Sequence, residues 1–569
     1  MKLIRIIIIM FLVSTVACTH MGRESSKPTV PEPSAYGKVE YSDAYYHYSL
    51  GVKADLRGNL DNSIKEYEKA LSLDPGSSYL MTQLATLYMR KNNITSALQL
   101  LKQSLIHDPD YADTHLLLGA VYSRLKEYDN ALESYKKVIK LDSNNLESYL
   151  FLGLLYRETS EYEKAVGALN SLLNIDPDNL MGNYYIAKIY MDMASYDKAE
   201  KSFKKSLAIN PSFESAITDL AMLYEVQRKE EDALEFFSDF VRRNPSAATA
   251  RLHLGKIMLR QEKYKDAARE FSKILDENAS HMEARYSLGL AYFFEGKDYN
   301  KAIEEFLLVL SKFPDDNRTR YFLASSYDKN GQHMEAFNEF KTVSQNSKLY
   351  PSALTHMALI LKDAGRSKEA IELIRGAVAG KEGEADLYGL LASLYDADNQ
   401  IDLAENTLIE AIKVFPDDID LRYKLAVIYE KTDRFSESVI EMKKLLKIDK
   451  NNAEALNFIG YGYADRGIKL DEAERLIKKA LELKPDNGFI TDSLGWLYFK
   501  TGRIDLAIKY LEKASEMLPD DPTIAEHLGD AYRKAGMDTA AKKMYLKALD
   551  LKQLSKETLQ EKINQLSGD

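Results

Sequence analysis

A 34-residue spacing runs through this 569-residue chain and constrains its fold more than any other feature. The units at this spacing follow one another in phase, and two of them carry one extra residue, those beginning at 282 and 453. Fifteen units begin at residues 44, 78, 112, 146, 180, 214, 248, 282, 317, 351, 385, 419, 453, 488 and 522. Repeats this short bury their apolar faces against their neighbours, so we predict an elongated array and exclude a single compact core.

Each unit predicts two antiparallel helices. Apolar residues fall at helical spacing in two blocks separated by a short polar break, such as KTGR at 500–503. Position 8 is Gly or Ala in all fifteen units, position 11 is Tyr in twelve, and position 20 is Ala in thirteen. Small residues at positions 8 and 20 let the two backbones approach, while Tyr at position 11 and a large residue near position 24 fill the adjoining space. Pro closes nine units and ends the second helix, because it cannot continue the hydrogen-bond ladder.

This pattern resembles the tetratricopeptide repeat, with its Leu-Gly-x2-Tyr, Ala-x3-Phe and closing Pro over 34 residues. The resemblance covers residues 44–555. It implies an all-α fold, a right-handed α-solenoid of about fifteen helix-turn-helix units whose first helices form a concave groove. Residues 556–569 are polar with three spaced apolar residues, and we predict that they form a capping helix over the last unit.

The N-terminus has a different character. Residues 1–17 combine Lys2 and Arg5 with a short apolar run, which is typical of an export signal. The following Cys18 is the only cysteine, and TVAC at 15–18 resembles the lipobox of bacterial lipoproteins, which implies a lipid-anchored Cys18. An uncleaved anchor and an ordinary cleavage after Ala17 are the alternatives. Residues 18–43 are rich in Ser and Pro and predict a tether between membrane and repeats.

The resemblance to lipoproteins also predicts a location. Thr19 follows the cysteine, where an Asp would retain an enteric-type lipoprotein at the inner membrane. We therefore expect a bacterial cell-envelope protein, anchored most simply in the outer membrane and facing the periplasm. Residues 457–521 resemble a tandem found near the C-terminus of many bacterial envelope proteins of this class.

Composition and motifs argue against nucleic-acid binding and against catalysis. The net charge is −11 with no block of Lys or Arg, so a phosphate backbone is an unfavourable partner. The nine His residues have no metal-ligand spacing, and the sequence contains no phosphate-binding loop and no nucleophile elbow. We therefore expect no catalytic residues, no metal and no cofactor, and we place function on the groove surface.

The resemblance implies that positions 2, 5, 9, 12 and 13 of the first helices face the groove. Lys188 and Lys256 occupy position 9, but Tyr184 and Leu252 precede them at position 5, so the carboxylate clamp of chaperone cofactors is not predicted. Aromatic, acidic and amide residues at groove positions suit a peptide partner, although any one ring could instead pack between neighbouring first helices. The candidates are Tyr184, Tyr286, Phe293, Tyr321, Tyr423, Asn457, Tyr461, Phe489, Asp492, Trp496 and Phe499, of which Trp496 is the only tryptophan.

Two functional hypotheses follow. The first is a membrane-tethered, non-enzymatic scaffold that binds protein or peptide partners in the groove, within an envelope complex for assembly or secretion of polysaccharide, pili or outer-membrane components. The second is a glycan- or peptidoglycan-binding module whose rings stack on sugars.

Overall fold

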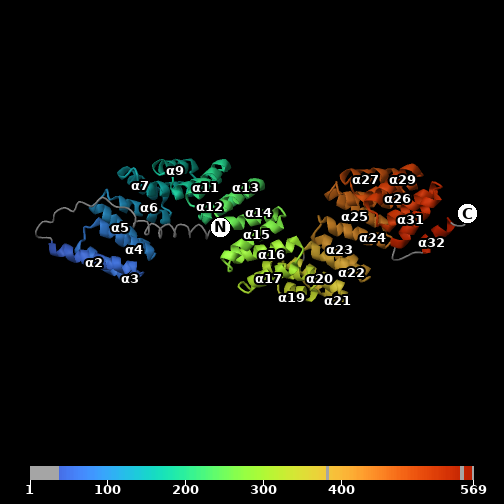
Figure 1. The fold of residues 1–569 in the computed structure, drawn as a ribbon, viewed down its shortest axis with the longest axis horizontal. Helices are drawn as coiled ribbons and strands as arrows, with labels where there is room; N and C mark the ends of the chain where they lie inside the picture. The colour runs from blue at the N-terminus through green and yellow to red at the C-terminus, as the bar shows by residue number, and fades with distance from the viewer. Residues whose placement is uncertain (1–37, 380–383, 552–556, 567–569) are drawn as a thin grey trace. The chain divides into compact units, whose positions relative to one another are not determined.

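The computed structural model describes residues 38–379, 384–551 and 557–566. Within these ranges every regular element is an α-helix, thirty-one in all, and successive helices alternate in direction (Figure 1). The chain divides into two compact units, one ending at Met258 and the other beginning at Leu259, near the end of α14. The prediction of an all-α fold built from consecutive helix pairs is confirmed within each unit.

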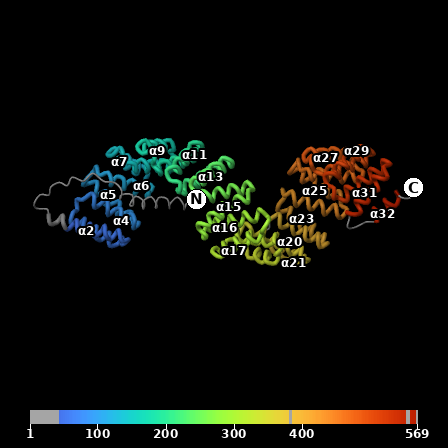
Figure 2. Tube along the Cα trace, in the orientation of Figure 1, coloured from blue at the N-terminus to red at the C-terminus, as the bar shows by residue number. Residues whose placement is uncertain are grey.

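The first unit holds the helices of the N-terminal repeats, traced as a tube in Figure 2. They are α2 (Lys38–Leu56), α3 (Leu60–Leu73), α4 (Ser78–Arg90), α5 (Ile94–His107), α6 (Ala112–Leu125), α7 (Tyr128–Leu141), α8 (Leu146–Glu158), α9 (Tyr162–Ile175), α10 (Leu180–Asp192), α11 (Tyr196–Ile209), α12 (Glu214–Gln227), α13 (Glu230–Arg243) and most of α14 (Ala248–Arg260).

The second unit holds the remaining repeats and a final short helix. Its helices are α15 (Tyr264–Glu277), α16 (Met282–Glu295), α17 (Tyr299–Leu310), α18 (Asn317–Lys329), α19 (His333–Lys341), α20 (Tyr350–Asp363), α21 (Ser367–Ala379), α22 (Ala385–Ala397), α23 (Ile401–Val414), α24 (Ile419–Lys431), α25 (Phe435–Ile448), α26 (Ala453–Asp465), α27 (Leu470–Leu483), α28 (Gly488–Lys500), α29 (Ile504–Met517), α30 (Pro522–Lys534), α31 (Asp538–Leu551) and α32 (Glu557–Gln565).

Local chemistry explains where these helices begin and turn. Asn or Asp caps many first helices: Asn487, for example, accepts a hydrogen bond from the backbone N–H of Ile490 at the start of α28. Between the two helices of a unit, position 15 is left-handed, with φ of 75° at Gly502 and 58° at Asp433. Gly, Asn and Asp tolerate this conformation best, although Lys126, Arg228 and Glu262 adopt it at the same position.

The small residue at position 8 marks the closest approach within a pair. A Cβ added at Gly119 in α6 would lie 2.4 Å from the ring of Tyr135 in α7, and one added at Gly529 would lie 2.6 Å from the ring of Tyr545. Both tyrosines occupy position 24 and are buried. The predicted pairing of a small residue at position 8 with a large one near position 24 is therefore confirmed in these units.

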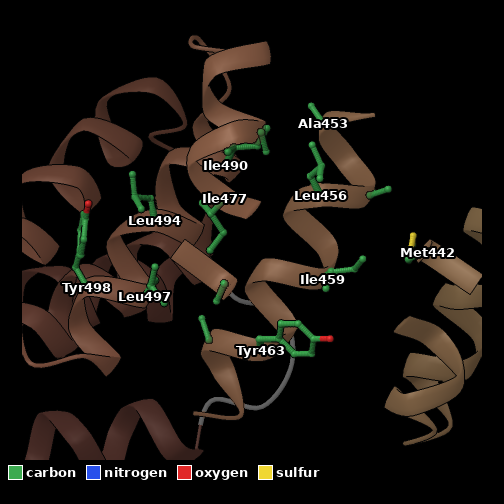
Figure 3. Packing of buried hydrophobic residues seen from close by; sticks show 14 of the residues in the cluster. Met442, Ala453, Leu456, Ile459, Tyr463, Ile477, Ile490, Leu494, Leu497 and Tyr498 are labelled. Atoms are coloured by element: carbon green, nitrogen blue, oxygen red, sulfur yellow. The ribbon is translucent and has the colours of Figure 1, made fainter. Parts of the chain in front are cut away.

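Neighbouring pairs stack through shared clusters of buried apolar residues. In the second unit, Leu456 and Ile459 of α26, Ile477 of α27 and Leu494 of α28 belong to one buried cluster (Figure 3). First and second helices of adjacent repeats contribute to the same cluster, so each repeat is stabilised by its neighbours.

The ends of the array differ in how far they match the sequence. Helix α2 begins at Lys38, inside the segment predicted as a tether up to residue 43, so the helical part starts earlier than expected. At the other end, α32 lies within the predicted cap, and its Leu559 and Ile563 are buried against Tyr545. The predicted signal segment 1–17 and Cys18 lie outside the described residues.

Candidate functional site

A pocket of about 510 Å³ opens on the first helices of four consecutive repeats in the second unit. These helices are α24, α26, α28 and α30, so the pocket lies on the groove side that the repeat pattern predicts. The lining residues are Tyr423, Glu430, Glu454, Asn457, Phe458, Tyr461, Gly462, Asn487, Phe489, Ile490, Asp492, Ser493, Asp521, Thr523 and Ile524.

Five of the predicted groove residues meet in this pocket. Tyr423, Asn457 and Asp492 occupy position 5 of three successive units, Tyr461 occupies position 9, and Phe489 occupies position 2. Helical repeats bring equivalent positions of neighbouring first helices side by side, and this explains why residues about 34 apart in sequence converge. Phe489 is the most open of the five, with 57% of its surface exposed.

Aromatic rings form the apolar part of the wall. The rings of Tyr423 and Phe458 meet edge to face with centroids 6.0 Å apart. Burial raises the pKa of Tyr461 to about 12, and the nearby carboxylates of Asp465 and Asp492 add to the shift. Tyr461 is therefore a neutral hydrogen-bonding phenol at physiological pH.

Two carboxylates that line the pocket form ion pairs with basic side chains that do not line it. Glu430 accepts a hydrogen bond of 2.7 Å from Arg466 through Oε1. Glu454 accepts one from Lys484, and this hydrogen bond lowers the pKa of Glu454. Glu454 is thus held in the charged form, because the ammonium of Lys484 lies beside it.

The other two carboxylates have structural partners. Asp492 is buried and accepts hydrogen bonds of 3.0 and 3.1 Å from Nδ1 of His527. Asp521 caps α30 by accepting from the backbone N–H groups of Thr523 and Ile524. Asp492 thus ties α28 to α30, Asp521 stabilises the start of α30, and both add acidic groups to the pocket.

Two oxygens of the lining residues have no hydrogen-bond donor. They are Oε2 of Glu430 and Oδ1 of Asn457, and both atoms are buried. Buried acceptor oxygens normally receive a hydrogen bond. Two such oxygens without a donor, both on residues of one pocket, suggest that a bound ligand supplies the missing donors.

Trp496, a candidate groove contact, packs between neighbouring first helices, which is the alternative that the sequence leaves open for any one ring. It is 9% exposed, and its ring stacks on His527 from the next repeat with centroids 4.0 Å apart. On its own helix the ring stacks on Phe499, with centroids 4.9 Å apart. Its Nε1–H donates to Asp465 of the preceding repeat over 3.0 Å. The ring joins three successive first helices, so Trp496 is a packing residue and not an open surface for a partner.

The remaining predicted rings lie away from this pocket. In the first unit, the hydroxyl of Tyr184 donates to Asp219 over 2.8 Å, and Lys188 donates to the same oxygen. In the second unit each of the other three is half-buried against a neighbouring ring. The centroid separations are 5.9 Å for Tyr286 and Phe306, 5.5 Å for Phe293 and Phe322, and 5.5 Å for Tyr321 and Phe340.

Sequence reasoning missed several pocket residues that its own pattern could have found. Glu430 occupies position 12 and Glu454 position 2, both named as groove positions by the resemblance. The selection favoured aromatic residues and so passed over these carboxylates. Ile490 and Ser493 each lie one residue away from a groove position, so the repeat pattern does not predict them. Their place in the lining is known only from the packing of the helices.

The described part of the chain holds no group of three or more His, Cys, Asp or Glu side chains arranged to bind a metal ion. Among the helices described, none is long and apolar enough to cross a bilayer. The pocket combines rings, carboxylates and amides, and this combination is suited to recognising a ligand by shape and charge.

Comparison with known proteins agrees with the repeat pattern. Models of the tetratricopeptide repeat match residues 56–121, 112–145, 146–179, 183–213, 218–271, 252–317, 390–453 and 493–555. These segments cover more than half of the chain. In the unmatched stretches, α18 to α21 and α26 to α27 continue the same helix pairing.

Similar proteins include a TPR repeat-containing protein of Pseudomonas aeruginosa. It is 31% identical over 170 residues, which are 30% of this chain and 29% of that protein. Among solved structures, MamA is 26% identical, with 30% of this chain and 93% of MamA covered and a TM-score of 0.28. Yeast Tom70 is 18% identical, with 80% and 95% covered and a TM-score of 0.36.

The matched models, the fifteen in-phase units and the paired helices agree. Stacked units of this kind present extended surfaces for protein–protein interaction. The chain therefore belongs to the tetratricopeptide repeat family and has the architecture of an interaction scaffold.

Proposed function

We propose that this protein is a lipid-anchored scaffold of the bacterial cell envelope that holds a polypeptide segment of a partner in the pocket on α24, α26, α28 and α30. The pocket is the observation that carries the binding part of the proposal. It draws on the first helices of four repeats and offers rings, an amide and carboxylates along one surface. An extended peptide can meet such a surface along its length, and aromatic side chains supply contact area at low entropic cost.

The state of the rings favours a peptide over a glycan. Sugar stacking needs an open, flat ring face, but Phe489 is the only ring of the lining that is mostly exposed. Tyr423 and Phe458 meet edge to face, so they pack on each other instead of offering two open faces. A mixed wall with acidic groups suits side chains of a polypeptide better than a stacked sugar.

Crosslinking from the pocket tests the binding proposal. A photoreactive phenylalanine analogue in place of Phe489, in the full chain in cells, should yield a discrete protein adduct. The same analogue at Leu546 on the second helix α31, which is 48% exposed, is the matched control and should yield none. Adding Thr523→Trp should fill the pocket mouth and abolish the adduct. Equal adducts at both positions, or a carbohydrate adduct at 489, would refute peptide binding here.

The envelope part of the proposal rests on the N-terminal sequence. Because Cys18 is the only cysteine, no other thiol can accept a thioether-linked lipid. Cys18→Ser should eliminate incorporation of labelled palmitate and release the protein from the membrane fraction, since stable anchoring needs more than one acyl chain. Ser26→Ala, eight residues further on, should label as the wild type does. Palmitate labelling that persists in Cys18→Ser would rule out the anchor.

A further inference from the structure

We infer that the pocket selects a partner segment carrying a basic side chain, lysine or arginine, and that Glu430 and Glu454 recognise it; this deepens the proposed function and rests on it. The charge of the wall is the first reason. Four lining residues are carboxylates, Glu430, Glu454, Asp492 and Asp521, and none of the described lining residues is Lys, Arg or His. A cleft walled by one sign of charge concentrates ligands of the other sign.

Two of these carboxylates are incompletely or weakly paired. Glu430 uses one oxygen for Arg466, and its Oε2 has no donor. Glu454 pairs with Lys484 at the surface, where the two side chains are 46% and 49% exposed, so that pair is weak and exchangeable. Asp492 and Asp521 are committed to His527 and to the α30 N-terminus, and they contribute charge alone.

The unmet acceptors point to a ligand rich in donors. Oδ1 of Asn457 and Oε2 of Glu430 are both buried without a donor. An ammonium carries three N–H donors and a guanidinium five, with no acceptor to repel the carboxylates. An acidic or purely apolar side chain would leave both oxygens unsatisfied.

The rings of the same wall suit a cation as well. Tyr423, Phe458 and Tyr461 line the pocket, and aromatic faces attract Lys and Arg. The protein already uses this contact around the site. Lys500 lies 5.0 Å from the Trp496 ring, and Arg466 lies 4.0 Å from the ring of Phe435.

Selection from a random peptide display library on the purified full chain tests the inference without a known partner. The enriched peptides should share a Lys or Arg at one position. Replacing it with norleucine or citrulline should weaken binding to the wild type at least about tenfold, as expected when a charged pair is lost. On Glu430→Gln or Glu454→Gln the same replacement should change binding less than about twofold, because the recognising charge is already gone.

Glu482→Gln removes an equal charge from an exposed site on α27 and should behave as the wild type. The thermal unfolding midpoint of Glu430→Gln should equal that of the wild type, which would show that weaker binding is not caused by misfolding. Glu454→Gln, at a partly exposed site, provides a second variant that is expected to fold normally. Enrichment of acidic or uncharged peptides, or basic peptides indifferent to both variants, would overturn the inference. If acidic or uncharged peptides are enriched and Thr523→Trp blocks their binding, the pocket still binds peptides and only the preference for a basic side chain is refuted. If no peptide is enriched, or if Thr523→Trp blocks the binding of none of them, the proposed peptide-binding function is refuted as well.

Discussion

Trp496→Ala should lower the free energy of unfolding by about 3–5 kcal/mol, the range for removing a buried Trp. The ring is 9% exposed and lies between Phe499 of its own helix and His527 of the next repeat. Its removal leaves a cavity where three first helices meet and deprives Asp465 of the indole donor. Urea unfolding followed by far-UV circular dichroism measures the change, since the variant has no tryptophan.

Phe489→Ala is the control on the same helix. Its ring is 57% exposed at the pocket mouth, so truncation should change the free energy of unfolding by less than about 0.5 kcal/mol. Equal, small effects of both substitutions would show that Trp496 is not a packing residue. In the wild-type protein, acrylamide should quench the fluorescence of the single tryptophan only weakly, for the same reason.

Gly119→Ala should destabilise the first unit by about 1–3 kcal/mol, although alanine is the better helix former. The added Cβ would lie 2.4 Å from Cε1 and 2.6 Å from Cζ of Tyr135, a ring that is 2% exposed and has no room to move away. The two helices of the pair must then separate, and their shared core loosens. Thermal unfolding of the full chain should show a lower midpoint.

Gly167→Ala, in the same unit, should change the free energy of unfolding in the opposite direction. This glycine lies within α9, and a Cβ there would meet no atom within 4 Å. Only the helix preference acts, so the substitution should stabilise by about 0.5–1 kcal/mol. Destabilisation by both substitutions, or by neither, would contradict the view that position 8 is set by the approach of the helices.

The repeat pattern predicted most of the fold because each of its positions has one dominant physical cause. Small residues at position 8 and large ones near 24 describe a contact between two helices only a few residues apart in the chain. That contact recurs at Gly119 and at Gly529. The left-handed turn at position 15 depends on one residue and its immediate neighbours, so residues such as Gly502 and Asp433 predict the break between the two helices of a unit.

The candidate site was less predictable. Helical periodicity gives the face on which a side chain lies but not how deeply it lies there. Trp496 and Phe489 occupy nearby groove positions of α28, yet one is 9% and the other 57% exposed. The difference arises because His527 and Asp465, from the two neighbouring repeats, meet the indole. Composition also says little about where the first helix begins, since α2 starts at Lys38, inside the segment 18–43 that composition assigns to a tether.

The all-α repeat, its 34-residue phase and the pairing of its helices can be predicted from the sequence, because they follow from short-range helix geometry and the spacing of apolar residues. The packed repeats, in contrast, are needed to show which candidate residues converge, which rings are covered, and which carboxylate has an oxygen without a hydrogen-bond donor. Those properties depend on how side chains from separate repeats share one space, and a periodic pattern carries no record of that arrangement.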